Sequence, residues 1–226
     1  GMERITALAI SLLFPAMIVI FLFVFATQFL LITFNVSSLY ELMSNFMCSI
    51  FDNMHNEFLK GMLYTVLLHF MWAFGLHGSH ILEPVATTTF ALGSSGDIFS
   101  KSFFDVYVVM GGCGTTICVL LAILLFMRNT KLRKIAELSS FTVIFNLNEI
   151  LTFGIPILLN PLLIIPFVLT PVMCYTISFL ATYAGLVPHV TADISWSTPI
   201  LFSGYMATGS IAGSILQVVM IVLGIG

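Results

Sequence analysis

The chain has 226 residues, of which 59% are hydrophobic and only 8% are charged, and its formal net charge is −3. A soluble domain usually carries about 25% charged residues, because its surface must be solvated by water. The composition therefore excludes an ordinary soluble globule and predicts a membrane protein. Seven Lys and Arg residues are also too few for a surface that binds nucleic acid.

The N-terminal part is predicted to hold a membrane span followed by a surface helix. Residues 5–34 are uncharged, and a span needs about 20 apolar residues. Pro15 is expected to kink this span. Between residues 36 and 58, apolar side chains recur at steps of three and four with acidic and amide residues between them, which predicts an amphipathic helix on a membrane surface or against another domain.

The middle of the chain alternates apolar and mixed segments. Residues 61–76 predict a span, whereas residues 79–104 are too polar for one and predict a short re-entrant hairpin or a loop. Residues 106–127 predict another span, with a glycine cluster that favours close helix packing. Four of the seven basic residues follow it and predict a cytoplasmic loop by the positive-inside rule: Arg128, Lys131, Arg133 and Lys134.

The C-terminal part contains one interrupted segment and two further spans. Residues 138–159 are apolar but broken by polar residues, and residues 161–187 predict a span bent by Pro166 and Pro171. A polar link over residues 188–199 precedes a last span at 200–225, where Gly209 and Gly213 are spaced for tight helix contact. The predicted fold is all-α and polytopic, with four to five transmembrane helices, an amphipathic surface helix and re-entrant segments, in a single transmembrane domain over residues 1–226.

Glu149 is the residue that carries most of the functional information. A carboxyl group at membrane depth costs about 2.5–3.5 kcal/mol on insertion scales, so such groups face a cavity or a partner. Asn148 beside it adds donors and an acceptor, and Gly154 and Pro156 indicate a broken backbone, which is tolerated in a membrane where it lines a cavity. The alternative is that residues 138–159 lie at the surface with Glu149 in water.

His77 is the second candidate, between Gly75 and Gly78 at the end of a predicted span. His80 and Glu83 follow at steps of three, so a metal site is one interpretation, although Gly78 and the proline after Glu83 weaken the helix that such a site needs. A structural histidine at the end of the span, and a histidine that binds a hydroxyl or handles a proton opposite Glu149, are the other two.

Trp196 is the third candidate, in a polar stretch of serines and a threonine. It is either an interfacial anchor, the commonest role of membrane tryptophans, or a platform on which a sugar ring stacks. Polar groups that bond hydroxyls, together with an aromatic face that covers an apolar ring face, are what a carbohydrate site needs.

Several strings of this sequence resemble, in order, the enzyme IIC family of the bacterial phosphoenolpyruvate-dependent sugar phosphotransferase system, in its lactose, cellobiose and diacetylchitobiose branch. The first two are Phe-Gly-Leu-His-Gly at 74–78 and Phe-Asn-Leu-Asn-Glu at 145–149, the latter running on to Pro156. Asn-Pro at 160–161, Ile-Pro-Phe at 165–167, Gly-Leu-Val-Pro at 185–188 and Trp-Ser-Thr-Pro at 196–199 follow. The resemblance covers nearly the whole chain.

The resemblance implies a multi-pass protein of the bacterial plasma membrane that binds and translocates a β-linked disaccharide of the cellobiose, chitobiose or lactose class in an occluded site. Matched position by position, the implied sugar contacts are His77, Asn148, Glu149 and Trp196. Glu149 and His77 would hold the hydroxyl that a phosphocysteine on a separate IIB subunit phosphorylates, and IIA would act through IIB. No cofactor or metal is implied. The cysteines of this chain are interpreted as small hydrophobic residues: Cys48, Cys113, Cys118 and Cys174.

The resemblance also has a departure, because family members are about twice this length and begin with a helical bundle that mediates dimerisation. The sequence is expected to correspond to the sugar-binding half without that bundle, working with a further half or a second copy. Two other functions stay open. One is an ion- or proton-coupled transporter with Glu149 and His77 as a relay, and the other is a truncated remnant that binds sugar without moving it.

Overall fold

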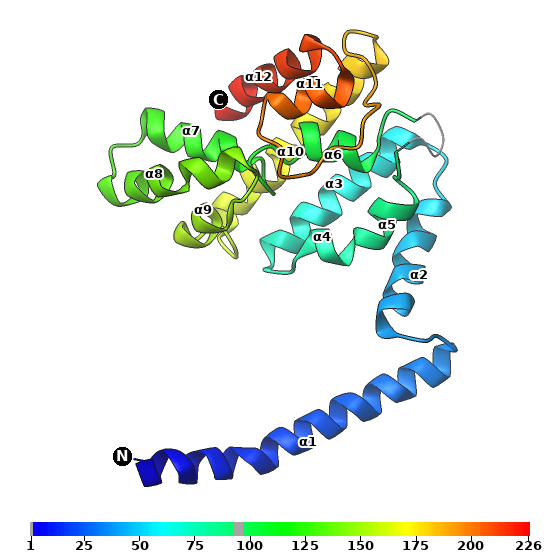
Figure 1. Cartoon of the computed structure of the whole chain (residues 1–226), viewed down its shortest axis with the longest axis vertical. Coiled ribbons are helices and arrows are strands. Elements are labelled where there is room, and N and C mark those ends of the chain that lie inside the picture. The colour runs from blue at the N-terminus through cyan, green and yellow to red at the C-terminus, as the bar shows by residue number, and fades with distance from the viewer. Residues whose placement is uncertain (1, 93–96) are drawn as a thin grey trace. The chain divides into compact units, whose positions relative to one another are not determined.

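The computed structural model describes residues 2–92 and 97–226, with side chains from residue 11 onward, and within these residues the secondary structure is entirely helical (Figure 1). The predicted all-α class is confirmed. Contacts divide the chain into two compact units, Gly1–Ser49 and Ile50–Gly226. The assignment of residues 1–226 to one transmembrane domain stays a prediction.

The first unit consists of a long apolar helix and most of an amphipathic one. Helix α1 spans Met2–Phe34, and its Ser11–Phe34 part is apolar and long enough to cross a membrane, with no side chain of its most apolar window buried. Helix α2 spans Leu39–Asp52 within the predicted amphipathic range. Its start is capped by two bonds: Ser38 Oγ accepts from the Glu41 N–H at 3.0 Å, and a Glu41 carboxylate oxygen accepts from the Ser37 N–H at 2.7 Å.

In the second unit, α3 (Glu57–Ala73) packs against α10 (Pro161–Tyr183), which is the second helix long and apolar enough to cross a membrane. Gly61 leaves room for the ring of Tyr175, whose hydroxyl donates to the Phe58 carbonyl at 2.8 Å. Aromatic rings in edge-to-face contact fill the space beside α3. The central ring is Tyr64, whose centroid lies 5.0 Å from that of Phe104. This rigid packing supports the wall of the site described below.

Between α3 and the next long element, the chain forms two short helices, α4 (Gly78–Ile81) and α5 (Glu83–Thr88). They occupy the segment for which the sequence predicts a re-entrant hairpin or a loop. Gly78 lies directly against the Leu68 backbone of α3, so any larger residue would displace α4 from that helix.

The predicted span over residues 106–127 is broken into two helices. Helix α6 (Lys101–Tyr107) ends before a run of turns at residues 108–115, and α7 (Thr116–Phe126) resumes after it. Gly111, Gly112 and Gly114 all have positive φ, at 79°, 100° and 81°. The glycines therefore break the helix as well as allowing close packing, because this left-handed backbone is accessible to glycine at little cost.

The predicted last span, residues 200–225, is also broken, into α11 (Phe202–Thr208) and α12 (Ile211–Ile225). Gly213 does provide the expected close approach, against the Gly204 carbonyl, but Gly209 ends α11 at φ 66° and has open space beside it, so its expected packing role is wrong. Buried Gln217 ties the pieces together. Its amide nitrogen donates to the Val106 carbonyl at 2.7 Å, and its oxygen accepts from the Leu201 and Gly204 N–H groups.

The basic segment is less loop-like than expected. Lys131, Arg133 and Lys134 belong to α8 (Thr130–Ile144), leaving Met127, Arg128 and Asn129 as the link from α7. Asn129 caps α8 by accepting from the Lys131 N–H at 3.0 Å. The short helix α9 (Glu149–Gly154) follows α8 across a turn, and the polar link at 188–199 is irregular, as predicted. The cytoplasmic placement of the basic residues and the number of membrane crossings stay predictions.

Candidate functional site

Three aromatic rings form one side of a cavity where α3 ends. Helix α3 stops at Ala73, Gly75 turns the chain at φ 78°, and His77 precedes α4 as its N-terminal flanking residue. The His77 ring lies against Trp72 at 4.6 Å between centroids and stacks on His80 at 4.0 Å with an interplanar angle of 27°. The end of a rigid helix therefore presents two imidazoles at fixed positions.

Another part of the cavity wall is built by the turn between α8 and α9. Asn148 is buried and its amide nitrogen donates to the Cys113 carbonyl at 2.9 Å, which fixes it against the 108–115 turn. Glu149 is the first residue of α9, and it is exposed and lines the cavity. The start of a helix is a favourable place for a carboxylate because the first N–H groups have no partners within the helix.

Asn146 joins three segments around the cavity. This residue adopts a left-handed backbone at φ 64°, and its side-chain oxygen accepts from the Gly111 N–H at 2.7 Å. Its amide nitrogen donates to the Trp196 carbonyl at 2.6 Å and to the Thr198 carbonyl at 3.4 Å. One amide thus holds the 108–115 turn, the α8–α9 turn and the link that carries Trp196 in a common arrangement.

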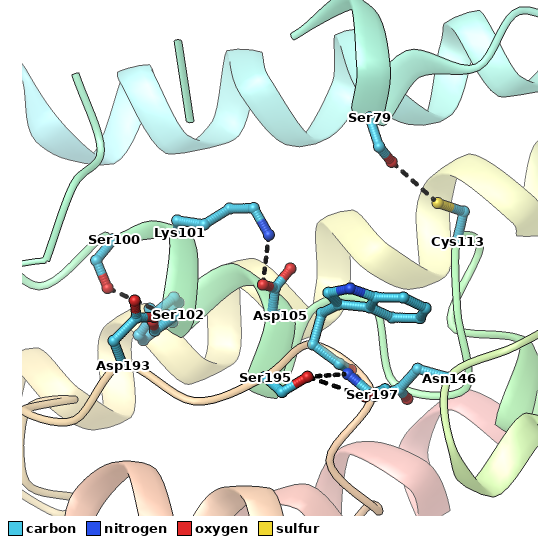
Figure 2. A network of polar contacts seen from close by, with 12 residues as sticks. Ser79, Ser100, Lys101, Ser102, Asp105, Cys113, Asn146, Asp193, Ser195 and Ser197 are labelled. Carbon is cyan, nitrogen blue, oxygen red and sulfur yellow. Dashed lines mark hydrogen bonds and ion pairs between the residues drawn. The ribbon is translucent and has the colours of Figure 1, made fainter. Parts of the chain in front are cut away.

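A charged pair projects from α6 toward the same cavity. Lys101 Nζ lies 2.5 Å from a carboxylate oxygen of Asp105, and one turn of helix separates the two residues. Beside them, the Ser102 hydroxyl donates to Asp193 at 2.6 Å, which ties α6 to the link before Trp196 (Figure 2). Because these charges are held in place by neighbours, the cavity has a preformed polar wall.

The cavity has a volume of about 360 Å³, within the range of sites that take small ligands. All four residues singled out from the sequence line it: His77, Asn148, Glu149 and Trp196. Glu149 favours the protonated form of His77, but partial burial and the neighbouring His80 have the larger effect and lower the pKa of His77 from its ordinary value of 6.5. The imidazole is therefore neutral at pH 7, where a ring nitrogen can accept a hydrogen bond from a hydroxyl.

A family model for "Phosphotransferase system, EIIC" matches residues 7–171, which is most of the chain. The chain belongs to this EIIC family. It is a membrane protein, and the resemblance inferred from its motifs is confirmed.

Named relatives and one solved structure agree with this assignment. The EIIC chain is 28% identical to the "PTS system oligo-beta-mannoside-specific EIIC component" of Bacillus subtilis (strain 168) over 99% of its own length and 53% of the relative's. It is 33% identical to the "PTS system cellobiose-specific EIIC component" of Geobacillus stearothermophilus, over 69% of this chain and 38% of that protein.

The solved structure is that of the transporter ChbC, the IIC component from the N,N'-diacetylchitobiose-specific phosphotransferase system. The match has a TM-score of 0.69 and 35% identity, and covers 83% of this chain and 45% of that one. The EIIC chain thus spans about half the length of these relatives or less, so activities of the whole proteins do not transfer to it directly.

Sequence reasoning missed part of the cavity. Lys101 and Asp105 received no role, although charges four residues apart in so apolar a chain are a signal that was available. His80 and Glu83 entered only as possible metal ligands. Both line the cavity, but no group of three or more metal-binding side chains exists among the side chains described, those of residues 11–92 and 97–226.

Proposed function

We propose that this EIIC chain forms the sugar-binding and translocating part of a phosphoenolpyruvate-dependent phosphotransferase system, and that its substrate is a β-linked disaccharide of the cellobiose, chitobiose or lactose class. The observation that carries the proposal is one cavity lined by His77, Asn148, Glu149 and Trp196, which come from three separate segments of the chain. The names of the oligo-β-mannoside, cellobiose and diacetylchitobiose relatives support the substrate class.

The chemistry of the cavity suits a sugar that must also be phosphorylated. The Glu149 carboxylate accepts a hydrogen bond from a sugar hydroxyl and polarises it for attack, as a general base does. A ring nitrogen of the neutral His77 accepts from an adjacent sugar hydroxyl, Asn148 bonds a further one, and the Trp196 indole covers an apolar face of the ring. A phosphocysteine on a IIB partner, recharged through IIA, supplies the phosphoryl group.

Phosphorylation also explains net uptake. The charged product recrosses an apolar membrane poorly, so modification on the inner side retains the sugar in the cell. This role places the chain in the plasma membrane of a bacterium as a multi-pass protein, a setting supported by the bacterial relatives. The bilayer, IIB and a further half or a second copy are the expected partners.

The test is equilibrium binding of labelled cellobiose to the purified chain and to Glu149→Gln. Removing the charge while keeping the shape is expected to abolish measurable binding, because a hydrogen bond to a charged group contributes about 1.5–3 kcal/mol. Glu137→Gln is the matched control, since Glu137 pairs with Arg133 on the exposed side of α8, outside the cavity. Equal affinity of wild type and Glu149→Gln would remove Glu149 from the site.

A second experiment separates this function from ion-coupled transport by the same residues. Sugar uptake into vesicles that contain the chain together with the rest of the transport system should require phosphoenolpyruvate and the IIA and IIB proteins. Uptake that follows a proton or sodium gradient without them would contradict the proposal while leaving the binding result intact.

A further inference from the structure

The second unit contains a second hollow with very different walls. It is a groove of about 750 Å³ between α7, α10, α12 and the turn after α9. Its lining is apolar except for the Cys118 thiol and the Thr170 hydroxyl, and it shares no lining residue with the polar cavity. A groove of this kind has no means of binding a sugar.

The rim of the groove stays apolar where it opens. Phe126 is 71% exposed, and Leu169 and Ile165 are both 58% exposed. Helices α7, α10 and α12 are all strongly apolar, and α10 is one of the two helices long enough to span a membrane. Because the chain is a membrane protein, acyl chains are the apolar groups that meet such a groove in its natural surroundings.

Positive charge lies at one end of the groove. Met127 and Leu132 line it, and between them the chain carries the exposed Arg128 and Lys131. Among the described residues, ion pairs join Lys101 to Asp105 and Arg133 to Glu137, so neither Arg128 nor Lys131 lies in an ion pair with an acidic side chain. The groove therefore ends beside two cations that are available to an external anion.

We propose that this groove binds one acyl chain of an anionic phospholipid, whose phosphate group lies at Arg128 and Lys131. An apolar groove continuous with a basic end matches the two halves of such a lipid, and basic residues next to a membrane helix attract anionic headgroups. A second copy of the chain or another protein segment would fill the apolar part but would leave the two cations without a counter-ion.

The experiment uses the full chain reconstituted in bilayer discs of equal parts phosphatidylglycerol and phosphatidylcholine, extracted in mild detergent and weighed by native mass spectrometry. The wild type should retain one phosphatidylglycerol in preference to phosphatidylcholine. The double variant Arg128→Gln, Lys131→Gln should lower that preference about tenfold or more, since both cations near the headgroup are lost. Arg133→Gln is the matched control, because that charge is already engaged by Glu137.

A variant that fills the groove tests the acyl-chain part of the proposal separately from the two cations. Ala122 lines the groove, and Ala122→Phe should abolish lipid retention while Arg128 and Lys131 remain. Three outcomes would each overturn the proposal. The wild type could retain both lipids equally, the double variant could retain phosphatidylglycerol as the wild type does, or the mass spectra could show a dimer of the chain without bound lipid. Cellobiose binding should be unchanged in all these variants, so this result is independent of the proposed transport function.

Discussion

The polar cavity at the end of α3 and the apolar groove lie in the same unit but differ in the side chains that line them. The cavity has a volume of about 360 Å³ and is lined by three of the ten acidic residues of the chain, one of its seven basic residues and two histidines. The groove, about 750 Å³, has no charged residue in its lining. In a chain with so few charges, their concentration at one cavity marks the place where a polar ligand is handled, because isolated charges in an apolar protein are costly.

The turns at residues 108–115 lie between the two regions. Gly112 and Cys113 line the cavity and Gly112 contacts Asn148, whereas Gly114 lies against Phe167, which lines the groove. One break in a helix thus contributes to both regions. The difference between the regions comes from the side chains that surround this break, since the backbone irregularity is common to both.

The largest effect is expected from Gly112→Ala. A Cβ atom at this position would lie 2.6 Å from Cγ of Asn148, and the φ of 100° is strained for any residue other than glycine, at a cost of about 1–3 kcal/mol. Asn148 would be displaced, and cellobiose affinity should fall by about 100-fold or more. Isothermal titration measures the affinity, and lipid retention in the groove should stay at the wild-type level.

Gly114→Ala is the comparison that shows whether the two regions are separable. Its Cβ would overlap the ring of Phe167, so the groove should be disturbed together with the turn. Helix content and the melting temperature of both variants are needed to exclude general unfolding. If Gly112→Ala removed lipid binding as strongly as sugar binding, the cavity and the groove would not be independent sites.

A smaller but more selective effect is expected from Asn146→Ala. The change leaves the buried Gly111 N–H without its partner, at a cost of about 1–3 kcal/mol. It also removes the more exposed bond to the Trp196 carbonyl, which holds the link that carries the indole. Cellobiose affinity should fall by about 10- to 100-fold through misplacement of Trp196. The emission of Trp196, measured in a Trp72→Phe background, should shift in the variant.

Thr142→Ala is the control for that experiment. Its hydroxyl donates to the Ser139 carbonyl within α8, one turn before Asn146, and Thr142 does not line the cavity. Unchanged Trp196 emission in Asn146→Ala, combined with normal sugar affinity, would show that the amide does not position the indole.

The helices could be predicted from the sequence where composition alone decides them. Helices α1 and α10 follow from long uncharged runs, and Pro166 and Pro171 did not end α10. The breaks within residues 106–127 and 200–225 were missed, because glycine is frequent inside membrane helices and gives no sign of whether it packs or turns. Leu201, with φ 74°, shows that some turns have no sequence signal at all.

The cavity was predictable only where polar residues interrupt an apolar run. Glu149 and Asn148 stand out for that reason. His77 and Trp196 were candidates with several interpretations each, and the motif resemblance favoured the one in which they contact a sugar. Lys101 and Asp105 come from a stretch of mixed composition, where their spacing of four residues is the available signal, and their position at the cavity depends on how α6 packs. A polar residue therefore identifies the site where its neighbours in the sequence are apolar, and it does not where its neighbours are also polar.

The smallest effect concerns pH, and it tests the polar side of the comparison alone. The pKa of His77 lies below 6.5 because of partial burial and the adjacent His80, with Glu149 acting in the opposite direction. The His77 ring is therefore neutral above pH 6.5. It gains a proton as the pH falls below 6.5, and the proton occupies the lone pair that accepts a hydrogen bond from a hydroxyl. Cellobiose affinity should be constant between pH 7 and 8 and should weaken below pH 6.5. The affinity lost by pH 5.5 should not exceed about tenfold, because an imidazole whose pKa is below 6.5 has at most about ten protonated rings for each neutral one at pH 5.5.

Two variants assign this titration to a residue. His77→Gln should bind cellobiose weakly at every pH, whereas His80→Gln should keep the pH dependence. A pH dependence that survives in His77→Gln would assign the titration to another group of the cavity.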